Sequence, residues 1–225
     1  MRKKKQEKLD FYQKKVVEKG ITYARSLVKS LKLKNPHPEP FSTIVMGGAG
    51  SGKSTVMNVL KQWLHLVLRR EGDNPDHPYV VVVAPTGTAA ANVRGQTLHS
   101  AFGFNFGNKH YSLSDKKRDT ARTMFKNLKV VIIDEISMIK SDLLYQLDLR
   151  LREIKQKDNK IFGGVSVFFG DIMQLRPCQG SFIFDKPMCE DYHLPFLCNT
   201  HWKSFDVIFL EENHRQGDNY MYGNY

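Results

Sequence analysis

Cysteine is scarce in this sequence, with three residues among 225. Cys178, Cys189 and Cys198 are an odd set without paired metal-ligand spacing, which argues against a disulfide framework or a zinc site. No apolar run is long enough to span a bilayer, and no apolar signal region is visible near the N terminus. These absences favour reduced thiols in the nucleus or cytoplasm, with no membrane partner.

Negative charge is also in short supply. The chain has 23 acidic and 34 basic residues, which give a net charge of +11. Such an excess favours a polyanionic partner, with nucleic acid ahead of membrane, although simple solubility also explains it. An apolar content of 41% is typical of a globular protein, and the length is sufficient for a proper core.

Short apolar runs rich in β-branched residues alternate with segments of helical periodicity. We expect strands at 42–46, 79–85, 129–135, 162–171 and 206–213. We expect helices over 1–33, over 53–70, from the stretch "TGTAAANV", and over 141–156. Residues 103–120 are polar and contain glycine, which indicates a surface insertion. The alternation predicts an α/β fold with a mostly parallel, doubly wound sheet and helices on both faces.

The stretch "GGAGSGKST" (47–55) lies between a predicted strand and a predicted helix. Its spacing fits the phosphate-binding pattern G-x-x-x-x-G-K-[ST] in full. Glycines let the backbone curl so that N–H groups point at phosphate oxygens, and the next helix presents its positive end to the same anion. A chance glycine turn is the weaker alternative. The predicted nucleotide-binding residues of this loop are Gly48, Ala49, Gly50, Ser51, Gly52, Lys53, Ser54 and Thr55.

A buried strand, "VVIID", ends in the carboxylates Asp134 and Glu135. Ligands of open α/β sheets bind at this carboxyl edge. We expect Lys53 to reach the β- and γ-phosphates of ATP, and Ser54 and Asp134 to hold Mg²⁺. Glu135 can accept a proton from the attacking water. Alone, the two acids could equally cap the following helix, but together with the glycine loop they favour an NTPase.

Five blocks in this order carry a resemblance to a known family. They are "GGAGSGKS", "APTGTAAANVRGQTLHSAF", "DEISM", "FGGVSVFFGDIMQLRP" and "LEENHRQGD". The chain resembles the Pif-type helicases of superfamily 1, in the branch shared with RecD, from about Leu9 to Asp218. The resemblance implies a RecA-like P-loop NTPase and an ATP-dependent DNA helicase that moves 5′ to 3′, with single-stranded DNA or DNA junctions as its partner. DNA repair, recombination and telomere maintenance are roles open to such a protein.

The resemblance also implies roles for three further residues near the nucleotide. Gln174 matches the glutamine that senses the γ-phosphate, and Arg215 matches an arginine that reaches the terminal phosphates. A satisfied loop amide and a surface arginine are the respective alternatives. Gln13 resembles the adenine-reading glutamine, although the family's Asn-x-x-Gln begins here with Asp10, so a helix-surface glutamine is about equally favoured. Arg176 stands where the family usually has proline.

The block "APTGTAAANVRGQTLHSAF" resembles the DNA-contacting part of the first motor domain. Thr86, Thr88, Thr97 and His99 are the implied donors to backbone phosphates. The aromatic residues Phe102, Phe104 and Phe106 could stack on bases, but their spacing is more typical of a core.

Three segments make up the predicted organisation. Residues 1–40 are a helix and a proline-rich linker, 41–218 a RecA-like ATPase domain, and 219–225 a tail. No later block resembles the motifs of a second RecA-like domain, so we expect a single motor domain, monomeric and weak in hydrolysis by itself. A non-catalytic, nucleotide-gated DNA-binding remnant is the alternative. An RNA helicase of the other large superfamily is disfavoured because "DEIS" lacks a second acid at its fourth position.

Overall fold

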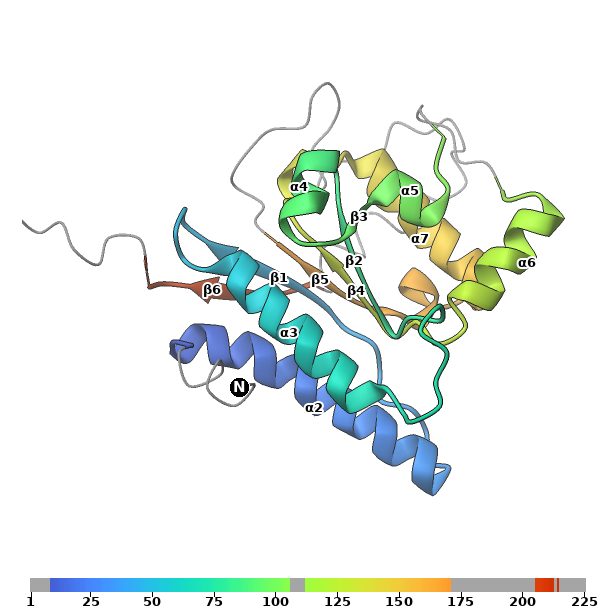
Figure 1. Cartoon of the computed structure of the whole chain (residues 1–225), viewed down its shortest axis with the longest axis horizontal. Helices are drawn as coiled ribbons and strands as arrows, with labels where there is room; N and C mark the ends of the chain where they lie inside the picture. Colours follow the sequence, from blue (N-terminus) through green and yellow to red (C-terminus); the bar gives the residue numbers. More distant parts are fainter. Residues whose placement is uncertain (1–8, 106–111, 171–204, 213, 215–225) are drawn as a thin grey trace, which may run out of the picture.

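A computed structural model of the chain describes residues 9–105, 112–170, 205–212 and 214 (Figure 1). In this part of the chain, six strands form one all-parallel sheet in the order β3-β2-β4-β5-β1-β6. The strands are β1 (Ser42–Gly47), β2 (Val80–Ala84), β3 (Gln96–Thr97), β4 (Val130–Ile133), β5 (Ser166–Phe169) and β6 (Phe205–Leu210). The predicted doubly wound α/β fold is confirmed. The two-residue strand β3 was not predicted.

Helices cover both faces of the sheet (Figure 1). The helices are α2 (Phe11–Leu33), α3 (Lys53–Leu68), α4 (Gly87–Asn92), α5 (Leu98–Phe102), α6 (Asp115–Met124) and α7 (Ser141–Lys155), with the 3₁₀ turns η1 (Ile136–Met138) and η2 (Ile161–Gly164). Helices α2 and α3 lie on one face, and α5, α6 and α7 lie on the other. Among the described helices, none combines the length and the hydropathy that a bilayer crossing requires.

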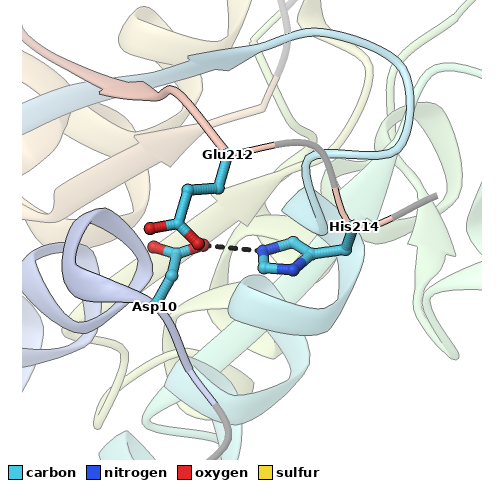
Figure 2. Close-up of side chains that lie close together, drawn as sticks. All are labelled: Asp10, Glu212 and His214. Atoms are coloured by element: carbon cyan, nitrogen blue, oxygen red, sulfur yellow. Dashed lines mark hydrogen bonds and ion pairs between the residues drawn. The ribbon is translucent and has the colours of Figure 1, made fainter. Parts of the chain in front are cut away.

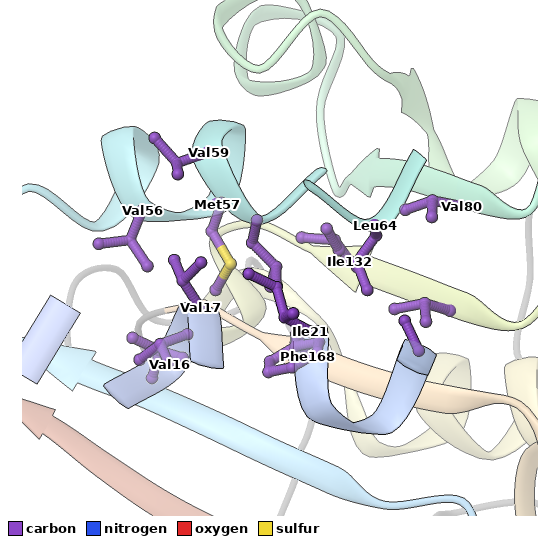
Figure 3. Close-up of a cluster of buried hydrophobic side chains, with 14 of the residues drawn as sticks. Val16, Val17, Ile21, Val56, Met57, Val59, Leu64, Val80, Ile132 and Phe168 are labelled. Carbon is purple, nitrogen blue, oxygen red and sulfur yellow. The ribbon is translucent and has the colours of Figure 1, made fainter. Parts of the chain in front are cut away.

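Each central strand buries both of its faces. In β4, Val130 and Ile132 belong to the cluster beneath α2 and α3, shown in Figure 3, whereas Val131 and Ile133 belong to the cluster beneath α7. All four side chains are fully buried. Successive side chains of a strand point to opposite faces, so a strand covered on both sides reads as one continuous apolar run.

Helix α2 begins at Phe11 because Asp10 caps it. The Asp10 side chain accepts from the backbone N–H of Gln13, and the Gln13 side chain accepts from that of Asp10. The helix then packs closely on α3, since a Cβ at Gly20 would overlap Cδ1 of Leu60. The apolar residues of α2 that face α3 and the sheet are buried, whereas Val28 is partly buried and Leu31 is 43% exposed.

The predicted surface insertion at 103–120 is wrong in part. Phe104 is buried, and its ring lies 6.2 Å from that of Phe102, which in turn lies 5.5 Å from the ring of Phe125. A polar helix, α6, then begins at Asp115. Phe102 and Phe104 are therefore core residues and not stacking platforms, while Phe106 lies outside the described residues.

Candidate functional site

The loop between β1 and α3 is curled by its glycines. Gly50 and Gly52 have φ values of 88° and 78°, a region that favours glycine. A Cβ at Gly47 would lie 2.5 Å from Oγ of Ser51, so a larger residue would displace the loop. The backbone N–H of Ser51 donates to the Gly48 carbonyl across the curl, at 3.2 Å.

The side chain of Lys53 lies inside this curl. It is 8% exposed, and its Nζ donates to the carbonyls of Gly47 at 2.6 Å and Gly48 at 2.9 Å. Helix α3 begins here without a side-chain cap, so its first amides have no partner within the helix. Oγ of Ser51 is buried and has no hydrogen-bond partner among the described residues. An ammonium group, uncapped amides and a spare hydroxyl are the donors that a phosphate requires.

Asp134 and Glu135 follow β4 at the same edge of the sheet. Only β5 lies between β4 and β1, so these two strands are about 10 Å apart. The acids follow the end of β4, and the glycine loop follows the end of β1. A Cβ at Gly170, which follows β5, would lie 2.9 Å from Oδ1 of Asp134, so glycine leaves room at this point. The exposed hydroxyl of Ser54 and the carboxylate of Asp134 are hard oxygen ligands of the kind that Mg²⁺ prefers.

Glu135 is held in an uncommon conformation. Its φ of 50° lies in the left-handed region, where backbone strain often accompanies function. Partial burial, and then the negative charge of Asp134, raise the pKa of Glu135 above its usual range. A carboxylate with a raised pKa is a better proton acceptor than an ordinary one.

Gln13 joins α2 to the glycine loop. It is 3% exposed, and its Nε2 donates to the Ser51 carbonyl at 3.0 Å. The interpretation of Gln13 as a helix-surface residue is therefore wrong.

His214 completes the same junction; it lies within the block "LEENHRQGD", but the sequence had indicated no role for it. Its Nε2 lies 2.7 Å from Oδ2 of Asp10 (Figure 2). The same Nε2 lies 2.8 Å from Nε2 of Gln13, and the backbone N–H of His214 donates to the Gly50 carbonyl. The ligand atoms of Asp10, Glu212 and His214 lie within 4.8 Å of one another. Gln13 of α2 and His214, which follows β6, thus both hydrogen-bond to carbonyls of the glycine loop.

A cavity of about 440 Å³ adjoins this junction and the start of α3. Its lining residues are Leu9, Gln13, Gly52, Thr55, Asn58, Val59, Gln62 and His214. It offers an apolar wall together with side-chain amides, which suits a nucleobase. The position is consistent with the base-reading role predicted for Gln13.

The predicted DNA-contacting residues gather at the carboxyl ends of β2 and β3. Thr86 caps α4 and Thr97 caps α5, each through its hydroxyl oxygen, and Thr97 is paired with Ala84 at the end of β2. Thr88 is exposed, and the half-buried ring of His99 lies edge-on to Phe104 at 6.1 Å. Burial lowers the pKa of His99, which keeps its imidazole neutral at physiological pH. The structure thus brings these residues to the same sheet edge as the glycine loop.

Gln174, Arg176 and Arg215 lie outside the described residues, so their predicted roles stay predictions.

A family model described as PIF1-like helicase matches residues 26–222 of the chain. The chain belongs to the PIF1-like helicase family. Among curated relatives of this family, the ATP-dependent DNA helicase PIF1 of Emericella nidulans is 36% identical over 140 residues. The ATP-dependent DNA helicase RRM3 of Saccharomyces cerevisiae is 35% identical over 135 residues. These matches cover 60% and 58% of the chain, but 18% of each relative.

Solved PIF1-like helicases share the fold. The crystal structure of Pif1 helicase from Candida albicans matches 92% of this chain and 41% of its own, with a TM-score of 0.67 and 26% identity. Bacteroides Pif1 bound to ssDNA matches 86% of this chain and 42% of its own, with a TM-score of 0.57 and 29% identity. The chain therefore spans less than half of the solved relatives, and its RecA-like α/β fold is established by them.

Proposed function

We propose that this chain is the nucleotide-hydrolysing part of an ATP-dependent DNA helicase. The observation that carries the proposal is the placement of Lys53 inside a curled glycine loop, at the sheet edge that also holds Asp134 and Glu135. Family membership and the names of the relatives, which are ATP-dependent DNA helicases, support it. We assign the ATPase domain to residues 41–218, preceded by the helix and linker of 1–40 and followed by a tail at 219–225.

The groups at this site have separate tasks in the proposal. The loop amides and the start of α3 bind the phosphates, and Lys53 moves from the loop carbonyls to the β- and γ-phosphate oxygens. Mg²⁺, held by Ser54 and Asp134, would neutralise charge on the phosphates. Glu135 accepts the proton of the attacking water. Gln174 and Arg215 are proposed to sense and neutralise the γ-phosphate.

Translocation requires that the nucleotide site and the DNA share one edge of the sheet. Thr86, Thr88, Thr97 and His99 lie at this edge and offer groups that contact a phosphate backbone without reading sequence. The solved relative bound to ssDNA supports the assignment of single-stranded DNA as the partner. Movement from 5′ to 3′, and the need for a second RecA-like domain for efficient unwinding, are part of the proposal.

The test is a DNA-stimulated ATPase assay on the full chain with Mg²⁺. We expect Glu135→Gln to lower turnover by about a hundredfold or more while ATP still binds, because a general base contributes that much. Glu18→Gln, on the exposed side of α2, is the matched control and should leave turnover unchanged. Equal turnover in the wild type and Glu135→Gln would refute the assignment of the base. ATP-dependent DNA binding without any turnover in the wild type would instead support a nucleotide-gated binding module.

A further inference from the structure

A second large hollow lies along the outer side of α3. It has a volume of about 1030 Å³ and is lined by residues of α3, of the segment that follows α3, and of the end of α4 and the residues after it. Its lining residues are Asn58, Lys61, Gln62, His65, Leu66, Arg69, Arg70, Glu71, Asn92 and Arg94. We call it the α3 groove. It shares no charged residue with the nucleotide site described above.

Positive charge dominates the α3 groove. Its cations are Lys61, Arg69, Arg70 and Arg94, and Glu71 is the single carboxylate among the lining residues. Within the described part of the chain, none of these four side chains forms an ion pair. The carboxylate of Asp73 accepts from the backbone N–H of Arg70, and this bond, together with the charges of Arg70 and Arg69, lowers the pKa of Asp73. Asp73 and Glu71 therefore offset part of the positive charge, and the four cations leave an excess of it in the groove.

The cations are aligned along one side of the helix. Lys61 and His65 are spaced four residues apart on α3, and Arg69, the C-cap residue of the helix, follows four residues after His65. From Lys61 to Leu68 the helix rises by about 10 Å, a length that spans more than one phosphate of a nucleic-acid strand, and Arg69 and Arg70 follow its end. Asn58 and Gln62 on α3 and Asn92 at the end of α4 add amide donors to the lining.

The opposite wall is fixed by backbone geometry. A Cβ at Gly95 would overlap the Val82 carbonyl, so the chain passes tightly over β2 at this point. Arg94, immediately before it, has a φ of 50°, and its carbonyl accepts from Nζ of Lys61 at 3.2 Å. The contact joins Lys61 to the backbone of Arg94, and the charge of Arg94 acts on Lys61.

Burial and neighbouring positive charge both act on the titratable groups of the groove. Burial, and then the charge of Arg94, lower the pKa of Lys61. Burial, followed by the charges of Lys61 and Arg69, lowers the pKa of His65. A bound polyanion would relieve this repulsion.

We propose that the α3 groove is an accessory binding track for the phosphate backbone of single-stranded DNA. The segment that carries Arg94 continues directly to Thr97 and His99, so a strand held at the sheet edge could extend along α3. The proposal deepens the DNA-binding part of the proposed function and rests on it. The groove donors are cations and amides, which bind phosphates but do not select bases.

The test measures binding of a fluorescein-labelled 20-nucleotide single strand to the full chain by anisotropy, over a series of salt concentrations. The groove variant is Arg69→Glu with Arg70→Glu. The matched control is Lys29→Glu with Lys32→Glu, which makes the same change in net charge on exposed positions of α2. We expect the groove variant to lose affinity by about tenfold or more, with the salt slope reduced by about two. The control should lose about threefold or less.

Two results would overturn the proposal that the α3 groove binds DNA. One is an equal loss of affinity in the groove variant and the control, which would indicate net charge alone. The other is groove-dependent binding of anionic lipid vesicles without groove-dependent binding of DNA. In both cases the ATPase test of Glu135 would be unaffected, so the proposed function is tested independently of the groove. Unchanged DNA-free ATPase activity in the groove variant establishes that it is folded.

Discussion

Gln13 shows how a single side chain can link secondary structure to the candidate site. Its carbonyl oxygen accepts from Asp10 at the start of α2, and its amide donates to Ser51 in the glycine loop. Both partners are backbone groups, and the contact is buried at Ser51 and partly buried at Asp10. A loosely matched motif in the sequence thus corresponds to a residue with two distinct structural contacts.

Replacing Gln13 should therefore reduce stability. Gln13→Ala leaves two backbone groups without partners, and each such loss costs about 1–3 kcal/mol. We expect the free energy of unfolding, measured with urea, to fall by about 2 kcal/mol. Gln62→Ala, at an exposed position of α3, should change it by about 0.5 kcal/mol or less. Equal effects of the two substitutions would contradict the bridging role.

Lys155 gives a residue-scale prediction about pH. Its Nζ donates to the carbonyls of Phe125, Lys126 and Leu128. Burial, and then the charges of Lys129 and Lys157, lower its pKa to about 8. An unfolded lysine has a pKa of about 10.4, so between the two values the unfolded chain binds more protons than the folded chain.

Stability should consequently rise with pH across this interval. We expect the unfolding free energy of the wild type, relative to that of Lys155→Met, to rise by about 2–3 kcal/mol from about pH 8 to about pH 10.4. Below about pH 8 this relative free energy should not change with pH. Hydrogen bonds to the three carbonyls favour the charged form and reduce the rise. Urea unfolding at several pH values measures it, and parallel curves for the two proteins would be inconsistent with a lowered pKa.

At the scale of elements, α7 and η2 are joined by a buried polar cluster. Asp148 is 1% exposed and accepts from Nε of Arg152 at 2.9 Å and from the backbone N–H of Phe162 at 2.5 Å. Phe162 has a φ of 50°, so Asp148 supports a turn that the backbone alone would not favour. Apolar periodicity indicated the helix but gave no sign of these buried charges.

Breaking this cluster should cost far more than breaking a surface pair. Asp148→Ala leaves a buried guanidinium without its carboxylate, and we expect a loss of about 3–5 kcal/mol in unfolding free energy. Asp115→Ala removes an exposed pair with Arg118, and should cost about 0.5 kcal/mol or less. Thermal and urea denaturation of both variants measure the contrast. Similar losses would show that the cluster does not anchor η2.

At the scale of the whole molecule, the elements that could be predicted well from the sequence are those with a clear pattern of apolar residues. Strands β1, β2 and β4 are continuous apolar runs, and α3 and α7 carry amphipathic stripes, so their positions followed from pattern alone. The glycine loop and Asp134 could be placed at one edge because parallel strands share it. Sequence alone could not give β3, which is too short to have a period.

Contacts between residues that are far apart in the sequence could also not be predicted from it. His214 meets Asp10 and Gln13 only because β6 lies beside β1 and α2 packs next to α3. The α3 groove likewise depends on the position of Arg94, which no helical or strand period predicts. Such contacts are set by the packing of distant segments, whereas motif spacing reports local geometry.

The central claim is that the curled loop binds a nucleoside triphosphate through Lys53. Calorimetric titration of ATP with Mg²⁺ into the full chain tests it most directly, with Lys53→Ala as the variant and Lys29→Ala as the exposed control. We predict binding of a single nucleotide, with affinity about tenfold or more lower in Lys53→Ala and unchanged in Lys29→Ala. Absence of ATP binding in the wild type, or equal affinity in the wild type and Lys53→Ala, would contradict the account.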